Sequence, residues 1–291
     1  MTRKINRRSF LSTLGVASVA AISSPTLNFL RAEENASVLN PKKVDALASK
    51  PVLTIAHCCD PQFGFGSYED ELARCKRELE LVNASKPDLV FFAGDMCHAR
   101  ANLKKEWPSL LKDVEAPYLT AVGNHDVPDP VKKEDVDRFV EVFGAEYASL
   151  ELNGWKVIVF NSQYIRPTEE TELYERQVEW FQKEVADGKE KGTPMILGSH
   201  VPPFVKSLDE KDEYFNFPTK IRQDFLDFAR ENGARFYLAG HTHTTLERNY
   251  RDVPILNAET TSRNFDNRPF GFRLLKIDAD MNYEWNFVGL E

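Results

Sequence analysis

The sequence predicts a layered α/β fold with two β-sheets, and three observations carry this prediction. Short apolar runs alternate with amphipathic runs from residue 51 to about residue 245. After residue 245 the pattern is rich in strands, which favours a second sheet. The composition, 42% hydrophobic and 28% charged over 291 residues, is that of an ordinary globular protein. It excludes the disordered, collagenous and multi-span membrane classes.

The apolar runs are expected to be strands buried on both faces, because they are short, continuous and bounded by polar or turn-forming residues. They cover residues 52–56, 89–93, 118–122, 155–160, 195–197 and 236–239. Amphipathic segments between them predict helices at 69–85, 103–112, 132–143, 172–189 and 220–232. Four more strands are expected at 247–251, 254–258, 272–277 and 283–288. Since no linker interrupts residues 51–291, they are expected to form one domain.

The first 32 residues predict an export signal of the twin-arginine type. Arg7-Arg8-Ser9-Phe10-Leu11 follows a basic start and opens an apolar stretch that is too short to span a bilayer. Two alternatives are a basic tail on a cytoplasmic protein and an uncleaved membrane anchor. Residues 33–50 are polar and are expected to be a linker. The predicted location is therefore the periplasm, with the twin-arginine export machinery as a partner and with membrane contact only through a retained leader.

Acidic residues outnumber basic ones 45 to 37, which gives a net charge of −8 at neutral pH. Such a chain has no general attraction for phosphate backbones, so nucleic-acid coating is not expected. An anionic substrate then has to be attracted by a local charge, for which a bound metal is the obvious source. The four cysteines form no Cys-x-x-Cys pair and are interpreted mainly as small buried apolar residues, although an even number in an exported protein also fits disulfides. They are Cys58, Cys59, Cys75 and Cys97.

Chemistry-bearing residues follow five of the predicted strands directly. The groups are Asp60-Pro61-Gln62, Gly94-Asp95, Gly123-Asn124-His125-Asp126, Gly198-Ser199-His200 and Gly240-His241-Thr242-His243. Loops at the carboxyl ends of strands in open α/β sheets converge on ligands. Mixed carboxylate, amide and imidazole donors suit Mn²⁺, Zn²⁺ or Fe rather than Ca²⁺. There are more donors than one ion needs, which favours a pair of metals that share a carboxylate.

These groups, in this order, resemble the calcineurin-like metallophosphoesterase superfamily over roughly residues 52–290. Four further segments are similar to the branch of serine/threonine phosphatases known as calcineurin-like phosphoesterase domain-containing protein 1. They are Asp60-Pro61-Gln62-Phe63-Gly64, Gly94-Asp95-Met96-Cys97-His98-Ala99, Asn161-Ser162-Gln163 and Asp212-Glu213-Tyr214-Phe215-Asn216-Phe217. The resemblance implies a four-layer fold, a sandwich of two mixed sheets flanked by helices, and a catalytic domain at 51–291.

The resemblance also implies two divalent metal ions, which are Mn, Fe or Zn, with Mg as a further candidate. One ion would take Asp60, Gln62, Asp95 and His243, and the second would take Asp95, Asn124, His200 and His241. A hydroxide held by the ions would attack phosphorus in line with the leaving oxygen. His125 would protonate the leaving group or stabilise the phosphate, with a third metal-ligand role as its alternative. Asp95, as the bridge, and His125 are therefore the expected catalytic residues.

Two departures from the family pattern bear on the activity. Gln62 stands where most members have histidine, so the first metal is expected to bind loosely and to favour Mn²⁺ or Mg²⁺. His98, Ala99 and Arg100 replace the aspartate and Arg-Gly of calcineurin itself, which weakens the case for a protein phosphatase. His98 is expected either to face the phosphate or to be an ordinary loop histidine. Asn161 is expected either to line the rim of the site or to cap a turn.

The predicted function is therefore a metal-dependent phosphomonoesterase that acts on a phosphorylated small molecule or a phosphoprotein, including phosphoserine and phosphothreonine. One alternative is a phosphodiesterase acting on nucleotides or lipid head groups, because the same metal centre serves both reactions. A second alternative is a metal-stabilised binding protein without turnover.

Overall fold

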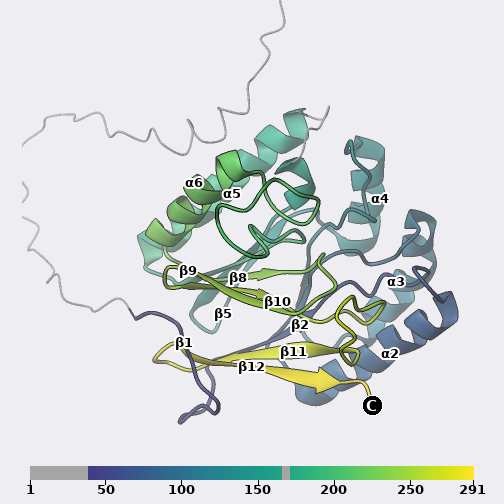
Figure 1. Cartoon of the computed structure of the whole chain (residues 1–291), viewed down its shortest axis with the longest axis horizontal. Coiled ribbons are helices and arrows are strands. Elements are labelled where there is room, and N and C mark those ends of the chain that lie inside the picture. Colours follow the sequence, from purple (N-terminus) through teal and green to yellow (C-terminus); the bar gives the residue numbers. More distant parts are fainter. Residues whose placement is uncertain (1–38, 166–170) are drawn as a thin grey trace, which may run out of the picture.

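The computed structural model describes residues 39–165 and 171–291. These residues form two six-stranded mixed sheets that pack face to face with helices on their outer sides, as Figure 1 shows. The predicted α/β class and four-layer arrangement are confirmed. The predicted export signal at 1–32 lies outside the described residues. Within them, no helix is both long enough and apolar enough to cross a membrane.

The first sheet has the strand order β1-β12-β11-β2-β3-β4. The strands are β1 (Lys42–Lys43), β2 (Leu53–Cys58), β3 (Leu89–Phe92), β4 (Tyr118–Thr120), β11 (Gly271–Ile277) and β12 (Asn282–Gly289). β2, β3 and β4 run parallel, whereas β11 is antiparallel to both β2 and β12. The carboxyl ends of the three parallel strands therefore meet at one edge of the sheet.

The second sheet has the order β5-β6-β7-β8-β10-β9. The strands are β5 (Ala148–Leu152), β6 (Trp155–Val159), β7 (Met195–Gly198), β8 (Ala234–Ala239), β9 (Leu246–Tyr250) and β10 (Val253–Asn257). The four inner strands are parallel, and β5 and β9 are antiparallel edges. The inner strands are almost continuously apolar because both faces of this sheet are covered.

Three apolar clusters fill the three interfaces between the four layers. Between the sheets, side chains such as Phe91 from β3 meet side chains such as Phe236 from β8. One outer cluster joins the first sheet to α2 (Tyr68–Ser85), α3 (Leu103–Leu110) and α4 (Lys133–Phe143). The other joins the second sheet to α5 (Thr171–Lys191) and α6 (Thr219–Glu231). The four cysteines are buried and unpaired, which agrees with their interpretation as small apolar residues.

Helix boundaries follow local chemistry. The Ser67 hydroxyl accepts a hydrogen bond from the Asp70 amide at the start of α2, and Lys86 ends this helix in a left-handed conformation. The helix predicted at 103–112 ends earlier, at Leu110, and continues as a 3₁₀ turn over Leu111–Asp113. Pro108 lies inside α3 and has no amide hydrogen to donate, which fits the short helix. Two other 3₁₀ turns cover Arg100–Asn102 and Ser162–Ile165.

Two edge strands are absent from the sequence-based prediction. β1 lies within the segment expected to be a linker, where the Lys42 amide donates to Met281 O at 3.0 Å. β5 has a mostly half-buried pattern and pairs with β6. Edge strands are held by backbone pairing on one side rather than by burial of a continuous apolar run, so their sequences carry a weak signal.

Candidate metal centre

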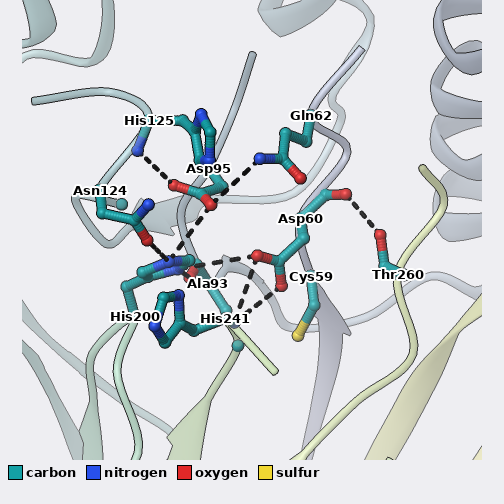
Figure 2. Close-up of polar contacts among 12 residues, drawn as sticks. Cys59, Asp60, Gln62, Ala93, Asp95, Asn124, His125, His200, His241 and Thr260 are labelled. Atoms are coloured by element: carbon teal, nitrogen blue, oxygen red, sulfur yellow. Dashed lines mark hydrogen bonds and ion pairs between the residues drawn. The ribbon is translucent and has the colours of Figure 1, made fainter. Parts of the chain in front are cut away.

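Loops that follow five strands of the two sheets converge at one place. Asp60 and Gln62 follow β2, Asp95 follows β3, and Asn124 follows β4. From the second sheet, β7 leads to His200, and β8 leads to His241 and His243. Figure 2 shows carboxylate, amide and imidazole groups pointing toward one another across the gap between these loops. All seven side chains predicted as metal ligands therefore lie in one region.

Two groups of three side chains have the spacing of metal-ligand sets. The donor atoms of Asp60, Asp95 and His243 lie within 4.8 Å of one another, as do those of Asp95, His200 and His241. Every member is buried, and Asp95 belongs to both groups. This is the arrangement expected when one carboxylate is shared between two cations.

Backbone carbonyls orient two of the imidazoles. His200 Nδ1 donates to Ala93 O at 2.7 Å, and His243 Nδ1 donates to Arg263 O at 2.7 Å. The opposite nitrogens therefore face the carboxylates, with His200 Nε2 at 3.4 Å from Asp95 Oδ2 and His243 Nε2 at 3.6 Å from Asp60 Oδ1. A ring nitrogen held by a carbonyl, with the other free to coordinate, is the usual state of a histidine that binds metal.

The backbone of the cluster is strained. Ten non-glycine residues of the described chain have positive φ, and five of them are predicted ligands. Those five are Asp60, Gln62, Asp95, His241 and His243. A left-handed conformation is costly for such residues and persists where the surrounding structure enforces it, most often at functional sites.

Glycine is required where the loops approach most closely. A Cβ atom on Gly123 would lie 2.1 Å from both the amide nitrogen and Oδ1 of Asp95. A Cβ atom on Gly240 would lie 2.8 Å from Asp60 Oδ2. Any larger residue at these two positions would displace a carboxylate of the cluster.

Backbone amides and imidazoles surround the two carboxylates. The His241 amide donates to Asp60 Oδ2 at 2.9 Å, and the His125 amide donates to Asp95 Oδ1 at 2.8 Å. Burial raises the pKa of Asp60. Burial also acts to raise the pKa of Asp95, but His200, His125 and His241 outweigh it and the pKa of Asp95 is lowered. Burial alone would lower the pKa of His200, but the charges of Asp95 and Asp60 raise it to about 9. The cluster therefore attracts positive charge.

The donor set fits divalent cations. Two buried carboxylates lie beside imidazole and amide groups, which is the donor chemistry that first-row transition metals prefer. Gln62 Oε1 is buried and has no hydrogen-bond partner among the described residues, while Gln62 Nε2 lies 3.5 Å from Asp95 Oδ2. A buried carbonyl oxygen without a partner is costly unless a cation or water satisfies it. Gln62 is thus available as an oxygen ligand.

Asn124 links the cluster to a loop that the sequence left without a defined role. Its Oδ1 lies 3.0 Å from His200 Nε2, and its Nδ2 donates to the Tyr214 hydroxyl at 2.6 Å. His241 Nε2 also lies 3.0 Å from Tyr214 O. The loop is anchored by buried Arg222, which donates to Leu208 O at 2.6 Å. The motif Asp212–Phe217 was the only sequence signal for Tyr214.

His125 and His98 lie side by side at the edge of the cluster. Their rings stack with centroids 4.6 Å apart, and His125 Nδ1 lies 3.3 Å from His98 O. Burial and the nearby His125 lower the pKa of His98. Both rings line a cavity of about 830 Å³ that continues past Asn124 to Arg100 and Arg138. The cavity gives a ligand at the cluster direct access to His125.

Three other polar residues have structural positions. Asn161 is fully buried, and its Oδ1 accepts from the Gln163 amide at 3.0 Å, which fits the turn-capping alternative. Asp126 joins two ligand loops by accepting from the Gly123 and Met96 amides, and burial raises its pKa to about 8. His57 is buried in β2, where burial lowers its pKa to about 4.

Comparison with known proteins places this geometry in a family. A family model described as calcineurin-like phosphoesterase matches residues 53–245. The chain is 25% identical over 246 residues to the serine/threonine-protein phosphatase CPPED1 of Rattus norvegicus, covering 76% of this chain and 79% of the relative. It is 26% identical over 193 residues to a "probable cyclic nucleotide phosphodiesterase" of Rhodococcus erythropolis, covering 62% and 60%.

The fold is also similar to solved structures. A dimetal phosphatase from Danio rerio superposes with a TM-score of 0.59 at 11% identity, covering 83% of this chain and 98% of the other. Members of the matched family carry divalent metal ions, and the two ligand groups around Asp95 lie where such ions would be held. The chain belongs to the calcineurin-like phosphoesterase family and is a metal-dependent phosphoric ester hydrolase.

Proposed function

We propose that this protein is a phosphomonoesterase with two divalent ions, one held by Asp60, Gln62, Asp95 and His243 and the other by Asp95, Asn124, His200 and His241. The observation that carries the proposal is the membership of Asp95 in both ligand groups. Mn, Fe or Zn fits the imidazole-rich set, and Mg fits the oxygen donors near Gln62. The similar Danio rerio protein is described as a dimetal phosphatase, which supports the pairing.

Each residue has a defined task in this proposal. The ions would activate a water molecule for attack and neutralise the phosphate oxygens. Asp95 would be the carboxylate that both ions share, and the His125 amide keeps its Oδ1 in place. His125 lines the cavity where a leaving group would lie, so its ring is placed to give a proton to the departing oxygen. Since the protein as a whole is acidic, these local positive charges are what attract the phosphate.

The substrate would be a phosphorylated small molecule or a phosphoprotein. The names of the CPPED1 relatives favour phosphoserine and phosphothreonine. A phosphodiesterase is the second candidate, favoured by the name of the Rhodococcus erythropolis relative. A binding protein without turnover is the least favoured, because every predicted ligand and His125 lie together at one cluster.

A comparison of two model substrates tests the proposal. Chelator-treated protein is supplied with Mn²⁺ and assayed with p-nitrophenyl phosphate and with its bis ester. Faster hydrolysis of the monoester is expected, because the free phosphate dianion is drawn to the paired cations. Faster hydrolysis of the bis ester would identify a phosphodiesterase instead. Hydrolysis of neither, by protein that binds the metal, would favour the binding protein.

The twin-arginine motif supports a proposal for the location as well. We propose export to the periplasm in folded form, through the twin-arginine machinery. Replacing Arg7 and Arg8 together by lysine should leave the protein in the cytoplasmic fraction, whereas the parent is recovered from the periplasmic fraction. Periplasmic recovery of the variant would contradict this route.

A further inference from the structure

Tyr214 contacts two predicted metal ligands through two different groups. Its hydroxyl accepts a hydrogen bond from Asn124 Nδ2 at 2.6 Å, and its backbone oxygen lies 3.0 Å from His241 Nε2. The ring of Tyr214 also lies beside that of His241, with centroids 4.8 Å apart. Asn124 and His241 are both assigned to the second ion under the proposed function. One residue from outside the predicted ligand set therefore adjoins two ligands of the same ion.

The backbone contact decides which nitrogen of His241 can bind a metal. A ring nitrogen 3.0 Å from a carbonyl oxygen is assigned the proton, because two atoms that both carry electron pairs would repel at that distance. The other nitrogen, Nδ1, then keeps its electron pair and is the atom available to a cation. Tyr214 O thus has the same relation to His241 that Ala93 O has to His200, whose Nδ1 donates to it at 2.7 Å.

The hydroxyl contact has the corresponding effect on Asn124. An amide binds a cation through its oxygen, and Asn124 Oδ1 points toward His200 Nε2 at 3.0 Å, as Figure 2 shows. Since Nδ2 donates to Tyr214, the oxygen is the end of the amide that faces the cluster. Hydrogen bonds in series polarise one another, so this bond also increases the negative charge on Oδ1. Both effects favour Asn124 as an oxygen ligand.

The loop that carries Tyr214 is fixed by buried polar side chains. Asn216 is buried, and its Oδ1 accepts from the Glu213 amide at 2.9 Å while its Nδ2 donates to Glu210 Oε1 at 2.7 Å. Arg222 of α6 is also buried and donates to Glu210 O at 3.0 Å. Tyr214 itself is 49% exposed, so packing of its ring does not explain this construction. A fixed loop is what accurate placement of metal ligands requires.

We propose that Tyr214 is a positioning residue for the second metal ion. Its hydroxyl holds the amide of Asn124 with the oxygen toward the ion, and its carbonyl holds His241 with Nδ1 toward the ion. This inference rests on the pair of ions in the proposed function. Because Asn124 and His241 are both ligands of the second ion, loss of the hydroxyl should weaken the binding of that ion.

Tyr214→Phe tests the hydroxyl contact, since it keeps the ring and the backbone carbonyl. Metal-loaded protein is dialysed against decreasing free Mn²⁺, and electron paramagnetic resonance separates paired from single bound ions. The two Mn²⁺ dissociation constants follow from these data. One of them should rise about 10-fold to 100-fold in the variant, the usual effect of removing a hydrogen-bond partner of a metal ligand. Two unchanged dissociation constants would overturn the proposal.

A second background separates positioning of Asn124 from a general effect on the loop. In Asn124→Asp no N–H group remains to donate to Tyr214, and either carboxylate oxygen can bind the ion. Adding Tyr214→Phe to Asn124→Asp should therefore leave the Mn²⁺ dissociation constants of that background nearly unchanged. A further loss as large as the one in the parental background would show that the tyrosine does not act through Asn124, and would refute the inference.

The matched control is Tyr250→Phe. The hydroxyl of Tyr250, on strand β9, donates to Asp227 Oδ1 of α6 at 2.8 Å, and Asp227 is not a predicted ligand. This variant makes the same chemical change as Tyr214→Phe and should keep both parental dissociation constants. An equal rise in Tyr250→Phe would contradict a specific role of Tyr214.

The metal measurement also separates this inference from the proposed function, because it requires no turnover. If the parent binds two ions but hydrolyses neither p-nitrophenyl ester, the phosphomonoesterase proposal fails, and weaker binding in Tyr214→Phe still supports the positioning role. If the parent binds one ion, the proposed pair fails. Tyr214→Phe then shows whether that ion lies at Asn124: weaker binding supports the role, and unchanged binding overturns it.

Discussion

Two regions of this protein bury carboxyl groups, and the pKa of the buried group is shifted in opposite directions in the two regions. At the metal cluster, Asp95 is surrounded by imidazoles and accepts from the His125 amide, and its pKa is lowered. Under the first sheet, Glu78 of α2 is fully buried, and the polar groups beside its carboxyl are the thiol of Cys58 and the hydroxyl of Thr261. Burial raises the pKa of Glu78 to about 8, which neighbouring Cys58 and Thr261 offset only in part.

The difference shows that burial alone does not make a carboxyl group functional. A carboxylate with amide donors and cationic neighbours stays ionised and can bind a metal, whereas a buried one with only a thiol and a hydroxyl beside it is protonated near neutral pH. Asp95 follows strand β3 of the first sheet, and Glu78 lies on helix α2, which packs against that sheet. Their different roles therefore come from their immediate neighbours. Substitution of Asp95 should therefore change metal content and activity, whereas substitution of Glu78 should change the pH dependence of stability.

The largest effect is expected for Asp95→Asn. A neutral amide cannot hold two dications close together, so phosphatase activity should fall by several orders of magnitude. Bound metal, measured by inductively coupled plasma mass spectrometry, should fall to one ion per chain or fewer. Glu78→Gln is the control, with metal content and activity like those of the parent. Two ions at full stoichiometry in Asp95→Asn would refute the assignment of the bridge.

His125→Asn should slow hydrolysis without loss of bound metal. With both ions retained, kcat should fall by about 10²-fold to 10⁴-fold, which is the usual contribution of a positioned general acid. The loss should be larger for an alkyl ester than for p-nitrophenyl phosphate, because the nitrophenolate leaves without protonation. An equal loss on both substrates would indicate phosphate binding instead, and loss of a metal would make His125 a ligand.

Gln62→His should strengthen the first metal site. Imidazole binds divalent transition metals more tightly than an amide oxygen does, so the variant should keep its metal at about tenfold higher chelator concentration. Its preference should shift toward Zn²⁺ or Fe. Metal retention across an EDTA titration, compared between the variant and the parent, measures this change in affinity. An unchanged titration would mean that Gln62 Oε1 faces no metal.

The smallest effect on activity, but a clear effect on stability, is expected at Glu78. Between its ordinary pKa of 4.5 and its folded pKa of about 8, folded Glu78 binds more protons than unfolded Glu78, so stability falls as pH rises. The slope for this group is at most about 1.4 kcal/mol per pH unit. Glu78→Gln removes that slope, and urea denaturation at pH 5, 6.5 and 8 should show the variant losing less stability than the parent. Parallel pH profiles would contradict the buried, protonated state.

Much of the fold follows from local pattern. The ten predicted strands and five helices all occur, with boundaries that differ by at most a few residues, because continuous apolar runs and amphipathic repeats report burial directly. The polar groups after β2, β3, β4, β7 and β8 were also recognisable, since they interrupt apolar runs at glycine-rich turns. Their assignment to two particular metals came from family resemblance and remains a prediction.

Other features depend on contacts between residues far apart in the chain. Asp60 and His241 are 181 positions apart and meet only when the two sheets pack together. The protonated state of Glu78, the turn-capping position of Asn161 and the stacking of His98 on His125 had no distinct local signal. Local sequence reports which residues prefer to be buried or to end a strand. The neighbours that set a pKa or orient a side chain are supplied by the packed tertiary structure, because distances of a few ångströms between distant segments determine those energies.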